Sequence, residues 1–74
     1  MPSVIEQIEE VVRNLFWSEK LPQYKNIYLK KAKRNIERLL KRYDVLEVLE
    51  KASETLKESD YLMLQNFLIE KGYF

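Results

Sequence analysis

Glycine is the residue that most constrains this chain, because only one occurs among its 74 residues, and it lies at position 72. Tight β-hairpin turns need residues with a positive φ angle, and glycine takes that conformation at the least cost. A fold built from many hairpins would therefore lack suitable turn residues. The chain also shows no strand pattern, so we expect an all-α fold.

Apolar residues recur at the three- and four-residue spacing of helices in four segments of the chain. These segments predict helices at approximately 4–17, 22–43, 45–57 and 60–71. Because the links between them are short, we expect a small compact bundle of three to four helices that forms one domain over residues 1–74. The end of the first helix has two alternatives. Either a loop covers Ser18–Leu21, or the helix runs on to Lys20 and breaks because Pro22 follows.

Two helix starts carry a recognisable capping pair. Ser3 precedes Glu6 by three residues, and Asp44 precedes Glu47 by the same distance. In this spacing the first side chain accepts a hydrogen bond from a backbone N–H of the first turn, and the glutamate reaches back to the cap. The two pairs therefore predict the starts of the first and third helices.

The last helix has signals at both of its ends. Ser59 or Asp60 is expected to cap its start, because both side chains accept hydrogen bonds from backbone N–H groups. Gly72 lies where a residue in the left-handed conformation would close the helix, and Tyr73 follows where an apolar residue packs back on the last turn.

The segment 22–43 is the longest helical pattern, and we expect the rest of the chain to be arranged around it. Residues 19–43 carry nine bases and two acids, for a net charge of +7, whereas residues 1–18 carry −2 and residues 44–74 carry −4. Apolar residues of the long helix fall on one side and basic residues on the other. The candidate nucleic-acid contacts on the basic side are Lys30, Lys33, Arg34, Arg38 and Lys41.

This uneven charge has two interpretations. In the first, the basic side faces DNA or RNA, and Tyr24 or Tyr28 would stack on nucleobases if exposed. Alternatively, the acidic residues that recur every three or four positions in the segment 45–57 neutralise the basic side within the fold. A sharp bend after Tyr43 would place the third helix beside the second as an αα-hairpin and bring these charges together.

Two pairs of aromatic residues are candidates for a protein interface. Phe16 and Trp17 follow Leu15, and three consecutive large apolar residues cannot all point into one narrow core. One of the two rings then covers the following loop, or it is partly exposed and meets a partner. Tyr73 and Phe74 either clasp the last helix or form an aromatic tail that docks on another protein.

Several functional classes are disfavoured by composition. The chain has no cysteine and no histidine, which removes disulfides, thiolate ligands and the commonest base and metal ligand. We expect no enzyme activity, no metal and no cofactor.

No apolar run approaches the roughly 20 residues of a membrane span, and Met1–Ser3 lead into a helix without a secretory pattern. We therefore expect a cytoplasmic protein that does not enter membranes. The abundance of Lys, Glu, Arg, Ile and Leu favours a heat-adapted, thermostable protein.

These exclusions leave binding as the expected function. The first hypothesis is a small helical adaptor or accessory subunit that acts through protein–protein contacts and would suit an assembly that processes nucleic acids. The alternative is direct, largely sequence-independent nucleic-acid binding through the basic face of the 22–43 helix. Apolar residues make up 46% of the chain, which is generous for so small a core, so a homodimer is a further hypothesis.

Overall fold

In the computed structural model, which describes residues 3–74, the chain forms four α-helices and one short 3-10 turn. The elements in chain order are α1 (Val4–Lys20), η1 (Pro22–Tyr24), α2 (Lys25–Leu40), α3 (Val45–Thr55) and α4 (Glu58–Glu70). No strand occurs within these described residues, so the all-α prediction is confirmed. The expected lead of Met1 and Pro2 into the first helix lies outside the described residues.

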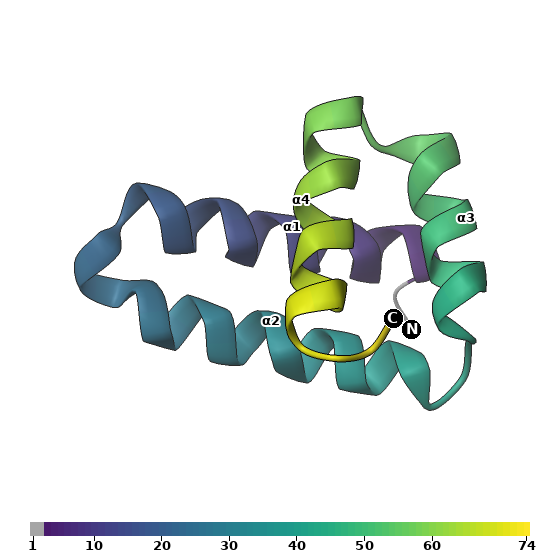
Figure 1. The fold of residues 1–74 in the computed structure, drawn as a ribbon, viewed down its shortest axis with the longest axis horizontal. Coiled ribbons are helices and arrows are strands. Elements are labelled where there is room, and N and C mark those ends of the chain that lie inside the picture. The colour runs from purple at the N-terminus through teal and green to yellow at the C-terminus, as the bar shows by residue number, and fades with distance from the viewer. Residues whose placement is uncertain (1–2) are drawn as a thin grey trace.

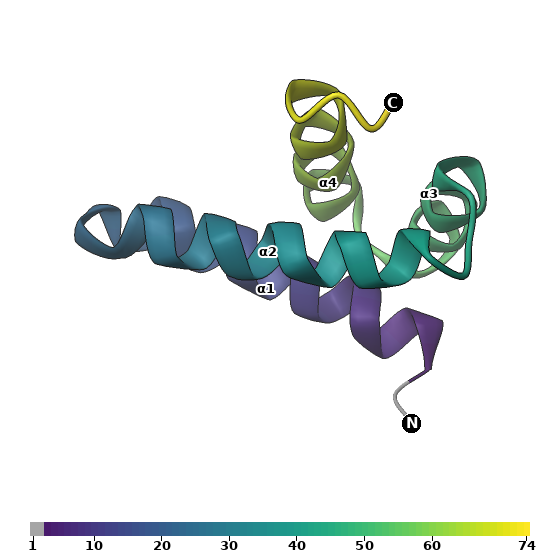
Figure 2. The same ribbon diagram turned by 90° about the horizontal axis from the view of Figure 1, so that it is seen from below.

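Helices α1 and α2 run antiparallel, side by side, and are joined by η1 (Figure 1). Helices α3 and α4 run antiparallel to each other and lie across one face of this first pair (Figure 2). α1 contacts all three of the other helices, so α1, rather than the expected 22–43 segment, is the element on which the fold is organised.

The second and third helices adopt a different arrangement from the expected αα-hairpin. A short turn joins α2 to α3, but α3 then crosses the end of α2, and the antiparallel partner of α2 is α1 (Figure 1). Burying one large apolar side chain stabilises a fold by roughly 1.5–3 kcal/mol, whereas an exposed ion pair contributes about 0–1 kcal/mol. Ile8 and Val11 of α1 are fully buried. Apolar burial therefore decides which helix α2 pairs with.

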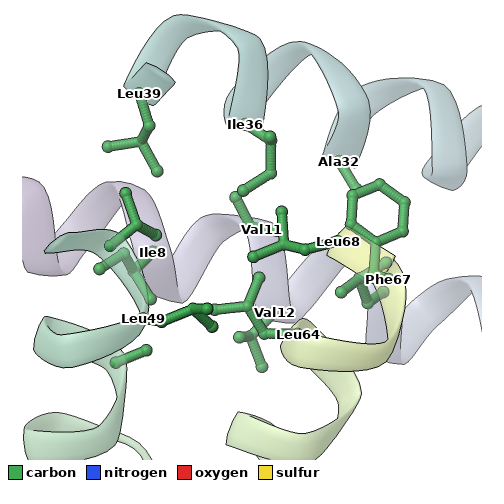
Figure 3. Packing of buried hydrophobic residues seen from close by; sticks show 13 residues of the cluster. Ile8, Val11, Val12, Ala32, Ile36, Leu39, Leu49, Leu64, Phe67 and Leu68 are labelled. Atoms are coloured by element: carbon green, nitrogen blue, oxygen red, sulfur yellow. The ribbon is translucent and has the colours of Figure 1, made fainter. Parts of the chain in front are cut away.

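The core lies where α1 meets the other three helices. Val11 of α1, Ile36 of α2 and Leu68 of α4 converge there (Figure 3). The buried apolar residues are Ile8, Val11, Val12, Leu15, Ala32, Ile36, Leu39, Val48, Leu49, Ala52, Leu64, Phe67 and Leu68. Every helix contributes to this one cluster, which holds the two helix pairs together.

Of the two expected ends of the first helix, the later one is observed, because α1 continues to Lys20. The N–H of Leu21 still donates to the carbonyl oxygen of Trp17 at 2.8 Å, and Pro22 then begins the 3-10 turn. Ser18 was the first residue of the alternative loop, yet it is buried in the last turn of α1. Its hydroxyl donates to the Leu15 carbonyl oxygen at 2.6 Å, which satisfies the polar group without water.

Both helices begin at the predicted caps; the Asp44–Glu47 pair forms the full capping box, and at Ser3 the serine half of the predicted pair is present. The Glu6 N–H donates to Ser3 Oγ at 3.2 Å at the start of α1. The Asp44 N–H donates to Glu47 Oε1 at 3.2 Å in the capping box that begins α3. These helix starts depend on residues only three apart, which is why the pattern alone located them.

The expected start of the last helix is wrong by two residues. α4 begins at Glu58, and the residue at its N-cap is Lys57, whose backbone is extended and whose side chain makes no capping hydrogen bond. Ser59 and Asp60 therefore lie inside the first turn. The carboxylates of Glu58 and Asp60 sit near the positive end of the helix dipole, which compensates in part for the missing cap.

The C-terminal end of α4 has the predicted glycine stop. Gly72 has a φ of 79°, and its N–H donates to the Ile69 carbonyl oxygen at 3.1 Å. The Tyr73 N–H donates to the Leu68 carbonyl oxygen at 2.9 Å, which completes a Schellman motif. The Tyr73 ring packs against the core cluster, so the hydrophobic clasp is formed.

Replacing Gly72 with alanine is expected to lower the free energy of unfolding by about 1–2 kcal/mol, because L-residues are strained in the left-handed conformation. A Cβ atom at this position would meet no heavy atom within 4 Å, so the cost comes from the backbone alone. Urea denaturation followed by circular dichroism measures it. Lys71→Ala is the matched control, since Lys71 is exposed and has a right-handed backbone. Equal stability of the two variants would contradict the assignment.

Candidate functional site

The candidate site is a row of basic side chains on α2 and the turn that follows it. We name this set the basic row. It consists of Lys30, Lys33, Arg34, Arg38 and Lys41, all of them exposed. The row extends over about 16 Å of helix at 1.5 Å per residue. Its position follows from the core, because Ala32, Ile36 and Leu39 are fully buried on the opposite side of the same helix.

The row is not uniform around the helix. At about 100° per residue, Lys30, Arg34 and Lys41 lie within about 40° of one another, whereas Lys33 lies further round. Glu37 is exposed between Lys33 and Lys30, and it is the one acidic residue of the α2 sequence. The sequence-based list of contacts left Glu37 out, although its register places it beside the row.

The basic row is not paired with the acidic residues of α3. In the part of the chain that the structure describes, no ion pair joins Lys30, Arg34 or Arg38 to an acidic side chain. α3 crosses the end of α2 instead of lying along it (Figure 1). The expected neutralisation within the fold is therefore not made by these residues.

Of the two tyrosines considered for base stacking, Tyr24 is the more available. Its side chain is 49% exposed, at the start of α2. Tyr28 is half-buried, and Lys31 Nζ lies 5.4 Å from the centre of its ring. Lys31 is an exposed base that the sequence-based list omitted, and its seven-residue spacing from Tyr24 and Arg38 would have placed it on the same side of the helix.

The two aromatic pairs lie in different parts of the molecule. Phe16 and Trp17 are 41% and 40% exposed near the end of α1, and their rings meet edge to face with centres 5.3 Å apart. Both rings are thus partly exposed, as in one of the two expected alternatives. Tyr73 and Phe74 follow α4, and the chain end lies far from the η1 end of the hairpin (Figure 1). The structure therefore does not bring the four rings to one surface.

Tyr73 also lies within electrostatic reach of α2. Burial raises the pKa of the Tyr73 hydroxyl above its usual value, and the negative charge of Glu37 raises that pKa further. The hydroxyl is therefore neutral at physiological pH.

A second candidate feature is an open groove of roughly 1090 Å³ between α1, the start of α2 and α4. Its rim carries both acidic and basic side chains. The apolar residues that line it are Val12, Leu15, Phe16, Leu29, Leu56, Leu62, Met63 and Phe67. Because the rim has both signs of charge, the groove favours an apolar segment rather than a charged ligand.

Within residues 3–74 no three acidic side chains are grouped closely enough to hold a metal ion. Glu50 and Glu54, which are four residues apart on α3, are both exposed. None of the helices in the same residues combines the length and apolar character needed to cross a lipid bilayer.

Comparison with known proteins identifies no relative: no family model, curated protein or solved structure matches this chain.

Proposed function

We propose that this chain is a non-enzymatic nucleic-acid-binding protein whose basic row contacts the phosphates of DNA or RNA without reading base sequence. The observation that carries the proposal is the exposed and unpaired state of Lys30, Arg34 and Arg38 among the described residues. Lysine and arginine contacts to phosphate position a protein on nucleic acid but carry no sequence information directly. The row therefore suits backbone recognition.

The near-neutral net charge of +1 does not oppose this proposal. Charges separated by more than about 8 Å are largely screened at physiological salt. A phosphate at the basic row therefore responds mainly to the local cluster of bases. Each phosphate contact also releases condensed counterions, which drives binding and makes it depend on salt concentration.

Reversing two charges of the row tests the proposal. The double variant Arg34→Glu/Arg38→Glu is expected to lose at least tenfold in affinity for a labelled oligonucleotide at low salt. The slope of log K against log salt should also become shallower by about 1.4 for a single strand or about 1.8 for a duplex, since two phosphate contacts are removed. Fluorescence anisotropy across a salt series measures both quantities.

The matched control changes the same net charge elsewhere. Lys51 and Lys71 are exposed, on α3 and after α4, so Lys51→Glu/Lys71→Glu should keep most of the slope. Equal losses in the two double variants would mean that overall charge, not the basic row, governs binding. No binding by the wild-type protein at low salt would reject nucleic-acid binding altogether.

A second candidate function is a protein-binding adaptor or accessory subunit, and the groove favours it. Phe16 and Leu62 line this groove and are 41% and 46% exposed, so an apolar segment of a partner would cover them. The partner can also be a second copy of the chain. Sedimentation equilibrium distinguishes that case, because a monomer mass at high protein concentration would exclude the homodimer.

A further inference from the structure

The η1 end of the α1–α2 hairpin is the least covered part of the fold. Both views show the end of α1, η1 and the start of α2 extending beyond α3 and α4 (Figures 1 and 2). Four of the large apolar side chains with substantial exposure lie in this part of the chain. We name this set the tip cluster, and it consists of Phe16, Trp17, Tyr24 and Ile27.

The rings of the tip cluster stand on a rigid backbone. The Leu21 N–H donates to the Trp17 carbonyl oxygen at 2.8 Å, and the Tyr24 N–H donates to the Leu21 carbonyl oxygen at 2.9 Å. Phe16 supports the Trp17 ring edge to face, with an angle of 85° between the two planes. Leu15 takes the inward position at this end of α1, so the core does not need Trp17. The outward-facing rings are therefore positioned by these hydrogen bonds and by the ring contact, and not by the residues that bury the core.

The tip cluster lies in a part of the chain that is rich in basic residues. Between Asn14 and Ile36 the chain carries six basic residues and a single acidic one, Glu19. Lys20 Nζ lies 5.5 Å from the centre of the Phe16 ring. An apolar protein partner would leave these ammonium groups desolvated and without counter-charges, which is costly. A polyanion that also presents flat aromatic groups matches both features.

Tyr24 ends η1 at the N-cap of α2, seven residues before the first of two exposed basic side chains of that helix. These two, Lys31 and Arg38, are themselves seven residues apart, so they lie on one side of α2 about 10 Å from each other. Proteins that bind single-stranded nucleic acid combine a positively charged track for the backbone with aromatic side chains on which bases stack. A duplex keeps its bases stacked inside and offers few base faces to such rings.

Building on the nucleic-acid binding proposed above, we infer that the preferred ligand is single-stranded nucleic acid, with bases stacked on Trp17 and Tyr24 and phosphates on the basic row. Binding then extends from the outer face of α2 to the hairpin tip.

Trp17 is the only tryptophan of the chain, so its fluorescence reports directly on the tip. Titration of the wild-type protein with an oligothymidylate single strand is expected to quench this fluorescence, and an equal length of duplex should quench it far less. Alanine substitution of a stacking ring costs about 1–3 kcal/mol per base. By anisotropy, Trp17→Ala and Tyr24→Ala should therefore each weaken single-strand binding roughly fivefold or more while changing duplex binding little.

Two further variants keep the test decisive. Trp17→Phe preserves a ring, so it should bind single strands within about threefold of wild type even if Trp17→Ala folds poorly. Phe74→Ala removes a ring that is 55% exposed at the other end of the molecule, and it should leave single-strand binding unchanged. Circular dichroism verifies that each variant is helical.

The outcomes separate the inference from the proposed function. Equal affinity for the two forms of nucleic acid, with no effect of Trp17→Ala or Tyr24→Ala, would overturn the single-strand inference and leave the basic row as a phosphate site. A fluorescence change that follows protein concentration without any oligonucleotide would assign the tip to a second copy and also overturn it. Absence of binding to either form at low salt would overturn both proposals.

Discussion

Leu64→Ala is expected to lower the free energy of unfolding by about 2–5 kcal/mol, because removing a fully buried leucine side chain loses apolar burial and leaves a cavity. Leu64 has no exposed surface and carries α4 onto the core that α1 and α2 form. A helical unit as small as this one has little stability to spare, so this one change should unfold much of the population near physiological temperature. Urea or thermal denaturation followed by circular dichroism measures the loss.

Leu46→Ala is the matched control for this prediction. Leu46 is 66% exposed on α3, so the same chemical change there should alter the free energy of unfolding by no more than about 0.5 kcal/mol. A cost at Leu64 as small as that at Leu46 would mean that α4 does not pack on the core as described. A large cost at Leu46 would instead indicate that a partner or a second copy covers α3.

Asn35→Ala is expected to lower the free energy of unfolding by about 1–3 kcal/mol, since it breaks a hydrogen bond in the α1–α2 contact. Asn35 is 9% exposed, and Asn14 Nδ2 donates to Asn35 Oδ1 at 2.8 Å. A double-mutant cycle with Asn14→Ala isolates the pair, and a coupling of about 1 kcal/mol is expected. Denaturation of the four proteins in urea supplies the cycle.

Asn26→Ala is the control for the Asn35→Ala prediction, because Asn26 lies on the same helix as Asn35 but is exposed. It should change stability little and show no coupling to Asn14→Ala. If the Asn14 and Asn35 changes were simply additive, the hydrogen bond would not contribute to holding α1 beside α2.

A polar pair in an otherwise apolar contact also favours one alignment of the two helices, because other alignments would leave an amide buried without a partner.

Signals that act within a few residues located the helix ends well. The capping pairs at Ser3 and Asp44 and the stop at Gly72 depend on hydrogen bonds between neighbours in sequence, so the pattern predicts them directly. The start of α4 was misplaced because no side chain caps it, and two good capping residues lie just inside its first turn. Where a local signal is absent, packing decides the boundary.

The choice of helix partners was not predictable from local patterns. Opposite charges suggested that α2 would pair with α3, but α2 pairs with α1 and buries Asn35 as well as Ile36 against it. Amphipathic patterns show which side of each helix is buried, not which neighbour buries it. Because exposed charge pairs contribute little, the total apolar area decides among arrangements that have similar patterns.

The candidate site was predicted in part. The register of α2 correctly placed the basic row on the outer face, because the 3.6-residue period relates exposed and buried positions on one helix. The tip cluster could not be predicted as a unit. It joins the end of α1 to the start of α2, and its exposure depends on how far α3 and α4 reach along the hairpin (Figure 1).

The central place of α1 has a consequence for synthesis on the ribosome. α1 leaves the exit tunnel before the three helices that bury it, and its apolar face includes Ile8 and Val11. α2 follows directly and covers one side, whereas Phe67 and Leu68 of α4 emerge only after α2 and α3. The nascent chain therefore holds a partly covered α1–α2 hairpin until α4 has emerged, and the core can close only then.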